Sequence, residues 1–123
     1  MIGNEKGNLG EKIACAYLEK NGYHIKERNY ISAFGEIDII AQKDGFIVFA
    51  EVKLRKKNSR VSGFESVSLS KQRKIIQTSA LYLQEISSDL QPRYDVISVT
   101  SYRDGEFSVE HIENAFDTQN IFY

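Results

Sequence analysis

The stretch GEIDIIAQKDGFIVFAEVKLR, residues 35–55, predicts a β-hairpin. Residues 36–43 and 46–54 are rich in Ile, Val and Phe, which are typical of strands. Asp44-Gly45 between them is the strongest short signal for a two-residue hairpin turn. With such a turn, each residue before it faces the residue at the same distance after it. The sequence therefore predicts the register of the hairpin as well as its strands.

The predicted hairpin has two unlike faces, because side chains alternate across a strand. One face is wholly apolar and must be buried: Ile37, Ile39, Ala41, Val48, Ala50, Val52 and Leu54. The other combines apolar and charged side chains: Glu36, Asp38, Ile40, Phe49, Glu51 and Lys53. In the predicted register Asp38 faces Glu51.

Directly opposed carboxylates repel each other, so a sequence selected for stability alone would avoid the Asp38–Glu51 pair. A divalent cation reverses the sign of that interaction. The two carboxylates and the Val52 carbonyl would form a hard-oxygen site suited to Mg²⁺, with Mn²⁺ as a substitute. Lys53 projects from the same face and could hold a phosphate or an attacking water. The alternative is a polar sheet face on which Lys53 neutralises Glu36.

The rest of the chain predicts two helices and three further strands. Helices are expected over 8–21 and 70–86, strands over 23–30, 93–102 and 107–113, and a loop over 55–68. Ser70 is the expected N-cap of the second helix. The order αβββαββ predicts an α/β fold, a mixed sheet flanked by helices, and 1–123 reads as a single domain.

Composition sets the class of protein. The chain is 41% hydrophobic and 27% charged, with a formal net charge of -1, so nucleic-acid binding would need a local basic patch. The single Cys15 excludes an intramolecular disulfide and fits a reducing cytoplasm. No apolar run approaches the length of a membrane span. We therefore expect a soluble cytoplasmic protein that does not bind membranes.

A basic patch follows the hairpin directly. The segment KLRKKNSR, residues 53–60, has five basic residues in eight, and more follow at the start of the second helix. The candidates for contacts with nucleic-acid phosphates are Arg55, Lys56, Lys57, Arg60, Lys71, Arg73 and Lys74. The alternative is a solvated loop, because runs of charge usually are just that.

The first predicted helix offers a third acid. Glu11 stands in line with Ala14, Cys15 and Leu18 at helical spacing, so it extends the inward-facing stripe of the helix. It could close over the acidic sheet face as a metal ligand or water-positioning group. The alternative is a solvated carboxylate that stabilises the helix N-terminus.

For Tyr30 and Phe34 we expect core packing rather than stacking on a splayed base.

Five segments in the same order resemble the bacterial YraN-like family (UPF0102) of predicted endonucleases. They are GxxGExxAxxYLxxxGY (7–23), GEIDII (35–40), FAEVKLR (49–55), SLSKQRKIIQTSALYL (68–83) and RYDVISV (93–99). The resemblance implies a restriction-endonuclease-like αβββαβ core, similar to archaeal Holliday junction resolvases, and Mg²⁺-dependent phosphodiester hydrolysis. By the same resemblance Asp38 and Glu51 match metal-binding acids, Lys53 the catalytic lysine and Glu11 the first-helix acid. Glu36 and Gln72 fall at auxiliary positions.

Two functions from different classes follow. The first is a metal-dependent endonuclease acting on branched, damaged or single-stranded DNA, and the second is a catalytically silent nucleic-acid-binding module of the same fold. A weaker alternative is a protein-interaction subunit that docks through its C-terminal AFDTQNIFY, residues 115–123. The sequence leaves open DNA or RNA, one metal or two, and the oligomeric state, a homodimer included.

Overall fold

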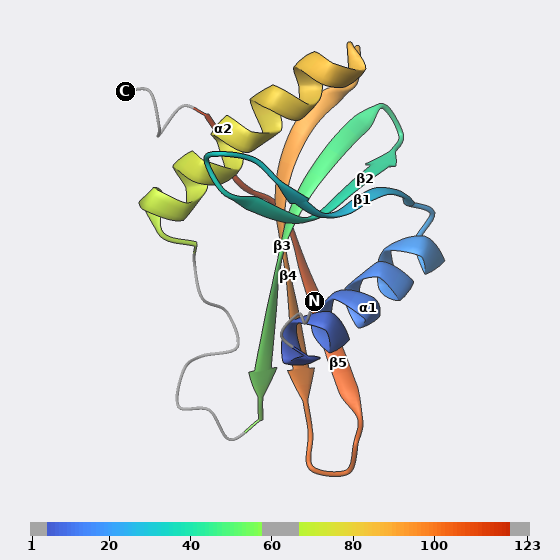
Figure 1. The fold of residues 1–123 in the computed structure, drawn as a ribbon. Coiled ribbons are helices and arrows are strands. Elements are labelled where there is room, and N and C mark those ends of the chain that lie inside the picture. The colour runs from blue at the N-terminus through green and yellow to red at the C-terminus, as the bar shows by residue number, and fades with distance from the viewer. Residues whose placement is uncertain (1–4, 58–66, 119–123) are drawn as a thin grey trace.

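The structure is a computed structural model that describes residues 5–57 and 67–118, with only the backbone of 5–8. Within these ranges the elements follow the predicted order αβββαββ (Figure 1). They are α1 (Glu5–Lys20), β1 (His24–Ile31), β2 (Glu36–Lys43), β3 (Phe46–Lys56), α2 (Leu69–Ile86), β4 (Gln91–Ser101) and β5 (Phe107–Phe116). No helix in the described ranges is both long enough and apolar enough to cross a membrane.

The strands form one mixed sheet in the order β1-β2-β3-β4-β5. Strands β3 and β4 are parallel, and the other neighbours are antiparallel. Parallel neighbours need a crossover connection, and α2 lies in the segment that joins β3 to β4. The protein therefore has an α/β fold, as predicted, and the fold is consistent with a restriction-endonuclease-like core.

The two helices cover opposite faces of the sheet (Figure 1). The α1 face buries Ala14, Cys15, Leu18, Tyr23, Ile39, Ala41, Val48, Ala50, Ile97 and Val99. The α2 face buries Ile37, Ile40, Ile47, Phe49, Val67, Ile75, Ile76, Tyr82, Tyr94, Val96 and Phe116. Alternate residues of β3 enter the two clusters, so both of its faces are covered where it runs through the centre of the sheet.

The predicted hairpin register is confirmed from the turn as far as the pair Ile39–Ala50, and the predicted pairs Asp38–Glu51 and Glu36–Lys53 lie beyond the ladder. Lys43 pairs with Phe46 next to the turn, and the ladder runs to the pair Ile39–Ala50, where it ends. Strand β3 continues beside β4 as far as Lys56, so β2 and β3 separate at Asp38 and Glu51. We call this point the fork. Figure 1 shows the lower part of β3 beside β4, away from β1 and β2.

One side chain lies on the face opposite to the predicted one. Ile37 belongs to the α2 cluster, although strict alternation puts it with Ile39 on the α1 face. The β1–β2 ladder pairs Arg28 with Ile39 and Tyr30 with Ile37, but has no pair at Asn29. Asn29 adopts the left-handed conformation, with φ 52°. Such a residue interrupts regular strand geometry, so the alternation changes phase beside the fork.

Three smaller predictions were wrong. Helix α2 begins one residue earlier than expected, and its N-cap is Ser68 rather than Ser70, because the Ser68 hydroxyl accepts a hydrogen bond from the Lys71 N–H at 3.2 Å. The expected loop over 55–68 starts late, since β3 runs to Lys56. Phe34 is 46% exposed and not in the core, whereas Tyr30 packs against the α2 cluster as expected.

Candidate active site

The fork brings together the two acids that the hairpin pattern predicted to be neighbours. Glu51 is the first residue of β3 beyond the ladder with β2, and it is 5% exposed. The Asp38 carboxylate accepts a hydrogen bond from the Val52 N–H, with 2.8 Å between Oδ2 and N. The Asp38 side chain thus takes the place of a backbone partner that β2 no longer supplies.

A backbone carbonyl faces the same gap. In a ladder, a residue's N–H and C=O point to the same neighbouring strand. Because the Val52 N–H points to Asp38, its carbonyl is directed into the fork as well. Two carboxylates and one carbonyl are hard-oxygen donors of the kind that Mg²⁺ prefers, and water completes such a site. The chemistry of this donor set fits the predicted metal.

The ionised form of Asp38 is electrostatically unfavourable at the fork without a metal ion. Burial, and next the negative charge of Glu51, raise the pKa of Asp38 from 3.8 to about 7. The Val52 N–H and the Lys71 ammonium act in the opposite direction but do not cancel these effects. A carboxyl group whose pKa is raised by burial and a like charge is typical of a functional site.

Lys71, in the first turn of α2, makes the direct ionic contact with the fork. Its Nζ lies 2.5 Å from Glu51 Oε2. Burial alone would lower the pKa of this ammonium, but the ion pair with Glu51 and the charges of Asp38 and Glu36 outweigh burial and raise the pKa. The sequence had suggested Lys71 as a phosphate contact, and the structure places it on an acid of the candidate site.

Lys53 lies two residues beyond Glu51 on β3 and is half-buried. Strand alternation puts the two side chains on the same face of β3. Glu36, the other predicted neighbour of Lys53, is exposed at the start of β2. An ion pair between Lys53 and Glu36 stays a prediction.

Glu11 reaches the neighbourhood of the fork from α1. Helix α1 approaches β3 closely, since a Cβ on Gly10 would lie 3.3 Å from Leu54 Cβ. Burial raises the pKa of the Glu11 carboxyl, with further upward contributions from Glu36 and Glu51, while Asn29 and Arg28 oppose the shift. Arg28 Nη2 lies 3.9 Å from Glu11 Oε1.

That Glu11 joins the other acids as a metal ligand stays a prediction. Among the described residues, no three His, Cys, Asp or Glu side chains are grouped closely enough to hold a metal ion. Arg28 and Asn29, both on β1, approach the Glu11 carboxylate, but its Oε1 is buried without a hydrogen-bond partner among the described residues. The donors at the fork itself are Asp38, Glu51 and the Val52 carbonyl, and Glu11 is close enough to influence the charge of Asp38.

A cleft of about 360 Å³ opens in front of Asp38. Its lining comes from the start of β2 and the N-terminal part of α2: Gly35, Glu36, Asp38, Ser68, Ser70, Lys71, Lys74 and Ile75. Lysines, hydroxyl groups and a helix N-terminus together attract phosphate. The cleft thus joins an acidic floor to a basic, hydrogen-bonding wall.

Gln72 does not line the cleft. Its Nε2 donates a hydrogen bond to the Val67 carbonyl at 2.9 Å, so it secures the residue that precedes the N-cap of α2. Its Oε1 is buried without a hydrogen-bond partner among the described residues. Of the two alternatives that the sequence left open, reaching the site or lying exposed, the structure shows neither.

The predicted basic residues divide between two places. Lys74 lines the first cleft and Arg73 is exposed on α2. Arg55 and Lys56 end β3 and Lys57 follows it, with Lys56 about 17 Å along the strand from Glu51 at 3.3 Å per residue. Arg60 and the C-terminal residues 119–123 lie outside the described residues.

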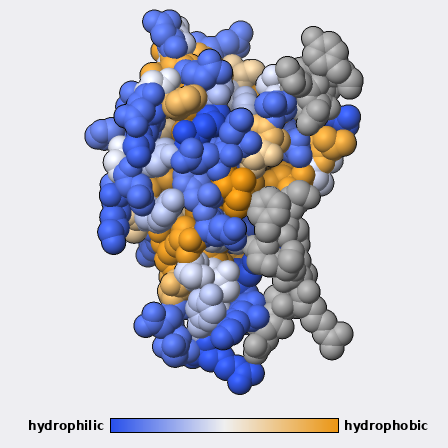
Figure 2. Space-filling model, turned by 180° about the vertical axis from the view of Figure 1, so that it is seen from behind, coloured by the Kyte–Doolittle hydropathy of each residue, from blue (hydrophilic) through white to orange (hydrophobic). Residues whose placement is uncertain are grey.

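A second cleft of about 300 Å³ lies at this far end of β3. Its lining residues are Lys56, Lys57, Ser101, Tyr102 and Arg103. The Lys57 ammonium lies 5.3 Å from the centre of the Tyr102 ring. Figure 2 shows strongly hydrophilic side chains at the bottom of the molecule, where β4 turns into β5. Sequence reasoning missed Arg103, because it is isolated in the chain and joins the other basic residues only through strand pairing.

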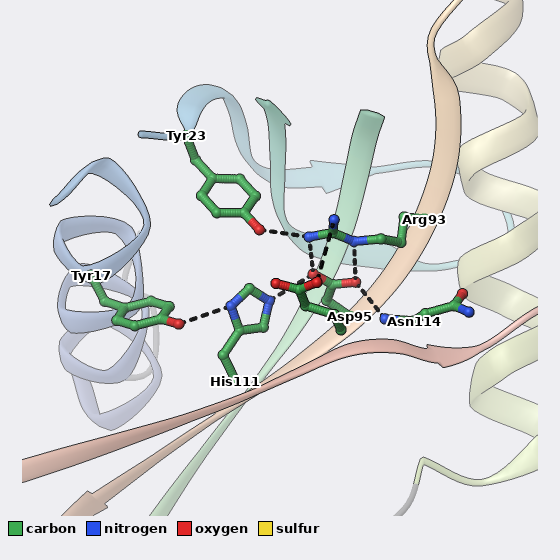
Figure 3. Close-up of polar contacts among 7 residues, drawn as sticks. Tyr17, Tyr23, Arg93, Asp95, His111 and Asn114 are labelled. Atoms are coloured by element: carbon green, nitrogen blue, oxygen red, sulfur yellow. Dashed lines mark hydrogen bonds and ion pairs between the residues drawn. The ribbon is translucent and has the colours of Figure 1, made fainter. Parts of the chain in front are cut away.

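A buried polar cluster on the α1 side of the sheet also escaped sequence reasoning (Figure 3). Asp95 is 0% exposed, and its two oxygens accept hydrogen bonds from three residues. Arg93 donates through Nε at 3.0 Å and Nη2 at 2.8 Å, His111 Nε2 lies at 2.6 Å, and the Asn114 N–H donates at 3.0 Å. The Tyr17 hydroxyl lies 3.0 Å from His111 Nδ1, and Arg93 also donates to Tyr23.

This cluster links β4 to the edge strand β5. Burial alone would raise the pKa of Asp95, but the hydrogen bonds from His111, Arg93 and Asn114 outweigh it and lower the pKa. Between the pairs Tyr94–Phe116 and Val96–Ile112 the register of β5 shifts, and Asn114 there is left-handed with φ 53°. The cluster lies on the α1 side, whereas Lys71 approaches the fork from the α2 side, so we assign it a structural role.

The fold and site together define the class: a mixed α/β sheet flanked by two helices, with two acids where β2 leaves β3. The model of the Uncharacterised protein family UPF0102 matches residues 10–99. The chain belongs to this family. The match includes Glu11, Asp38, Glu51, Lys53 and Lys71.

Bacterial relatives match over nearly the full length of both chains. A UPF0102 protein of Persephonella marina is 45% identical over 117 residues, covering 91% of this chain and 93% of that protein. A UPF0102 protein of Syntrophotalea carbinolica is 43% identical over 112 residues, and covers 90% of each chain. A UPF0102 protein of Myxococcus xanthus is 38% identical over 116 residues, covering 92% and 90%.

Proposed function

We propose that the protein is a metal-dependent endonuclease that hydrolyses phosphodiester bonds in DNA, with branched, damaged or single-stranded DNA as the substrate class. The observation that carries this proposal is the acid pair at the fork. Asp38 and Glu51 are held together in a largely buried place where their charges oppose each other, and the pKa of Asp38 is raised to about 7 as a result. A bound divalent cation would offset the repulsion between the two carboxylates and would account for their being held together.

Asp38, Glu51 and the Val52 carbonyl would hold Mg²⁺, or Mn²⁺ in its place. When bound, the ion supplies Lewis-acid stabilisation of a phosphate oxygen and lowers the pKa of a coordinated water. Asp38 Oδ2 also accepts the hydrogen bond from the Val52 N–H, and this contact fixes the direction of the Val52 carbonyl. The acids are thus positioned by the backbone geometry of the fork.

The remaining polar groups of the site suit the phosphate. Lys53 lies on the face of β3 that carries Glu51, where its charge offsets negative charge that develops on the phosphoryl oxygens. Ser70 and Lys74, in the first cleft, offer a hydroxyl and an ammonium to the neighbouring phosphate. Glu11 influences the charge of Asp38 and is near enough to the fork to position water or to support a second ion.

The basic residues beyond the fork extend the binding surface. The rise of a B-DNA strand is about 3.4 Å per nucleotide, so the roughly 17 Å from Glu51 to Lys56 corresponds to about five nucleotide steps. Lys56 and Lys57 therefore suit phosphates some distance from the scissile bond. Contacts of this kind orient the substrate without reading its sequence.

One observation favours a second candidate, a nucleic-acid-binding module without catalysis. Glu51 is already ion-paired with Lys71, and Glu11 is engaged by Arg28 and Asn29. An acid that already has a cationic protein partner has less need of a metal ion. The two candidates predict different results in a cleavage assay, because only the nuclease depends on divalent ions.

The test is a cleavage panel with single-stranded, nicked, flap and four-way-junction DNA, with Mg²⁺ or Mn²⁺ and with EDTA as the control. We expect divalent-dependent cleavage by the wild-type protein. Asp38→Asn, Glu51→Gln and Lys53→Ala should each reduce the rate about 10²-fold or more, as loss of one electrostatic group in an active site commonly does. Glu110→Gln and Lys26→Ala, which change exposed residues on the edge strands, are the matched controls.

Two results would count against the nuclease. Cleavage that survives Asp38→Asn would belong to a contaminating enzyme. Wild-type protein that binds these DNAs but cleaves none of them would support the silent module, and the same panel with RNA strands then distinguishes the two nucleic acids.

A further inference from the structure

The ion pair between Lys71 and Glu51 is a close contact at the candidate active site. Lys71 Nζ lies 2.5 Å from Glu51 Oε2, and the side chains are 50% and 5% exposed. The buried partner is therefore the acid, while the lysine reaches in from the surface. Asp38 and Glu36 add to the negative potential at the ammonium.

The position of Lys71 in α2 is unfavourable for a cation unless the acids of the fork compensate for it. The first turn of α2 contains no acidic residue, and the N–H groups of a helix N-terminus carry partial positive charge. Lys71 donates its backbone N–H to the N-cap Ser68, so its backbone is fixed in that turn. Lys74 lies one turn further along the helix and lines the same cleft, which makes it a natural comparison for Lys71.

We propose that the Lys71 ammonium is the resident counter-cation of the Asp38–Glu51 pair, and that a divalent ion displaces it from Glu51, so that it turns within the first cleft to contact a substrate phosphate. This inference rests on the proposed metal site. It adds that Lys71 is a positioning residue with two places, on Glu51 without metal and on phosphate with it. A single residue thus couples metal binding to phosphate binding.

Competition for the same oxygen is the physical basis. A divalent ion bound by Glu51 competes with the Lys71 ammonium for the same carboxylate, and two cations on one carboxylate repel each other. The flexible four-carbon stem of lysine lets the ammonium move without moving the helix. The cleft that Lys71 lines also contains Ser68, Ser70 and Lys74, which makes it suited to a phosphate.

The experiment is chemical labelling of lysines with an amine-reactive acetylating reagent, read by mass spectrometry, with Ca²⁺ as a non-reacting divalent probe and EDTA as its control. An ion-paired ammonium reacts slowly, because the reagent needs the free amine. Without metal, Lys71 should react more slowly than Lys74, the matched neighbour in the same cleft. With Ca²⁺, the rate at Lys71 should rise severalfold and that at Lys74 should stay unchanged.

Variants make the test independent of catalytic activity. In Glu51→Gln, Lys71 should react fast with or without Ca²⁺. Lys71→Met should lower the melting temperature of the metal-free protein relative to Lys74→Met, because the buried Glu51 loses its partner. Lys71→Met should also bind Ca²⁺ severalfold more tightly, as measured by calorimetry at a pH above 8, where Asp38 is ionised in the wild type.

The outcomes separate the two proposals. If Ca²⁺ raises the melting temperature of the wild-type protein but leaves the labelling of Lys71 unchanged, the displacement is refuted and the metal site stands. If Lys71 reacts as fast as Lys74 without metal, and equally fast in Glu51→Gln, it is not the counter-cation. If no divalent ion binds the wild-type protein, the metal site itself is wrong and displacement falls with it.

Discussion

Replacing Asp38 by Asn should stabilise the metal-free protein at pH 8. The substitution removes a charge that the fold holds at a cost, yet it keeps an amide oxygen that can accept the Val52 N–H bond. In the wild type, burial and the charge of Glu51 raise the pKa of Asp38 to about 7. The asparagine side chain has no charge to bury, and the ion pair of Glu51 with Lys71 is retained.

The magnitude follows from the pKa. The ordinary value is 3.8 and the folded value is about 7, a difference of about three pH units. At about 1.4 kcal/mol for each pH unit, the ionised Asp38 reduces the free energy of unfolding by up to about 4 kcal/mol. Part of this is shared with Glu51, since the two acids titrate together. We therefore expect Asp38→Asn to gain about 2–4 kcal/mol above pH 7, or roughly 5–15 °C in melting temperature.

The sign of the pH dependence is fixed by the direction of the shift. Between pH 4 and 7 the folded protein binds a proton at Asp38 that the unfolded chain releases, so wild-type stability falls as the pH rises through this range. The advantage of the variant should therefore be small near pH 4, grow toward pH 7 and stay constant above it. Mg²⁺ should reverse the order by stabilising only the wild type.

The assay is urea denaturation in EDTA, followed by circular dichroism across this pH range, with and without excess Mg²⁺. Asp89→Asn, which changes an exposed acid after α2, is the control and should show no such pH dependence. If Asp38→Asn is less stable than the wild type at pH 8, or if the difference does not vary with pH, the charge conflict at the fork does not exist and the reasoning is refuted.

Two further predictions concern regions away from the fork. Replacing Arg55, Lys56, Lys57 and Arg60 by Gln should weaken DNA binding for all sequences and reduce the slope of log K against log salt by about 0.9 for each duplex phosphate that the variant no longer neutralises; unchanged affinity and slope in a fluorescence titration would make these residues ordinary solvated surface. Asp95→Asn should cost about 3–5 kcal/mol in the free energy of unfolding, because it leaves buried donors without their carboxylate. Since the pKa of Asp95 is lowered, the wild-type protein should lose this stability as the pH falls below about 4, whereas the variant should not, and acid denaturation monitored by far-UV circular dichroism compares the two.

The hairpin was predictable because its signals are local. Asp44-Gly45 accepts the positive φ values of a two-residue turn, 50° and 85°, so the turn fixes the register and the register brings Asp38 toward Glu51. The stripe of α1 was predictable for a similar reason, since helical spacing alone places Ala14 and Leu18 on one side. In each case the chemistry of neighbouring residues determines the geometry.

Other features depend on contacts that no local pattern records. The left-handed Asn29 changes the phase of β1 and β2, and nothing in the flanking residues requires it. Lys71 meets Glu51 only because α2 crosses the fork, and Glu11 meets Arg28 only because α1 lies beside β1. Asp95 is the one acidic residue of β4, and a buried acid there predicts a partner but does not identify it.

The two irregular strands have a consequence for self-association. Strands β1 and β5 are the edges of the sheet, and an exposed regular edge is a template for pairing with a second copy. Each edge is distorted by a left-handed asparagine, Asn29 on β1 and Asn114 on β5. The Asp95 cluster anchors the second distortion, so straightening β5 would break the bond to the Asn114 N–H. A homodimer built by continuing the sheet across either edge would have to undo these bends, which favours growth of any assembly through the helical faces and keeps the open sheet from polymerising.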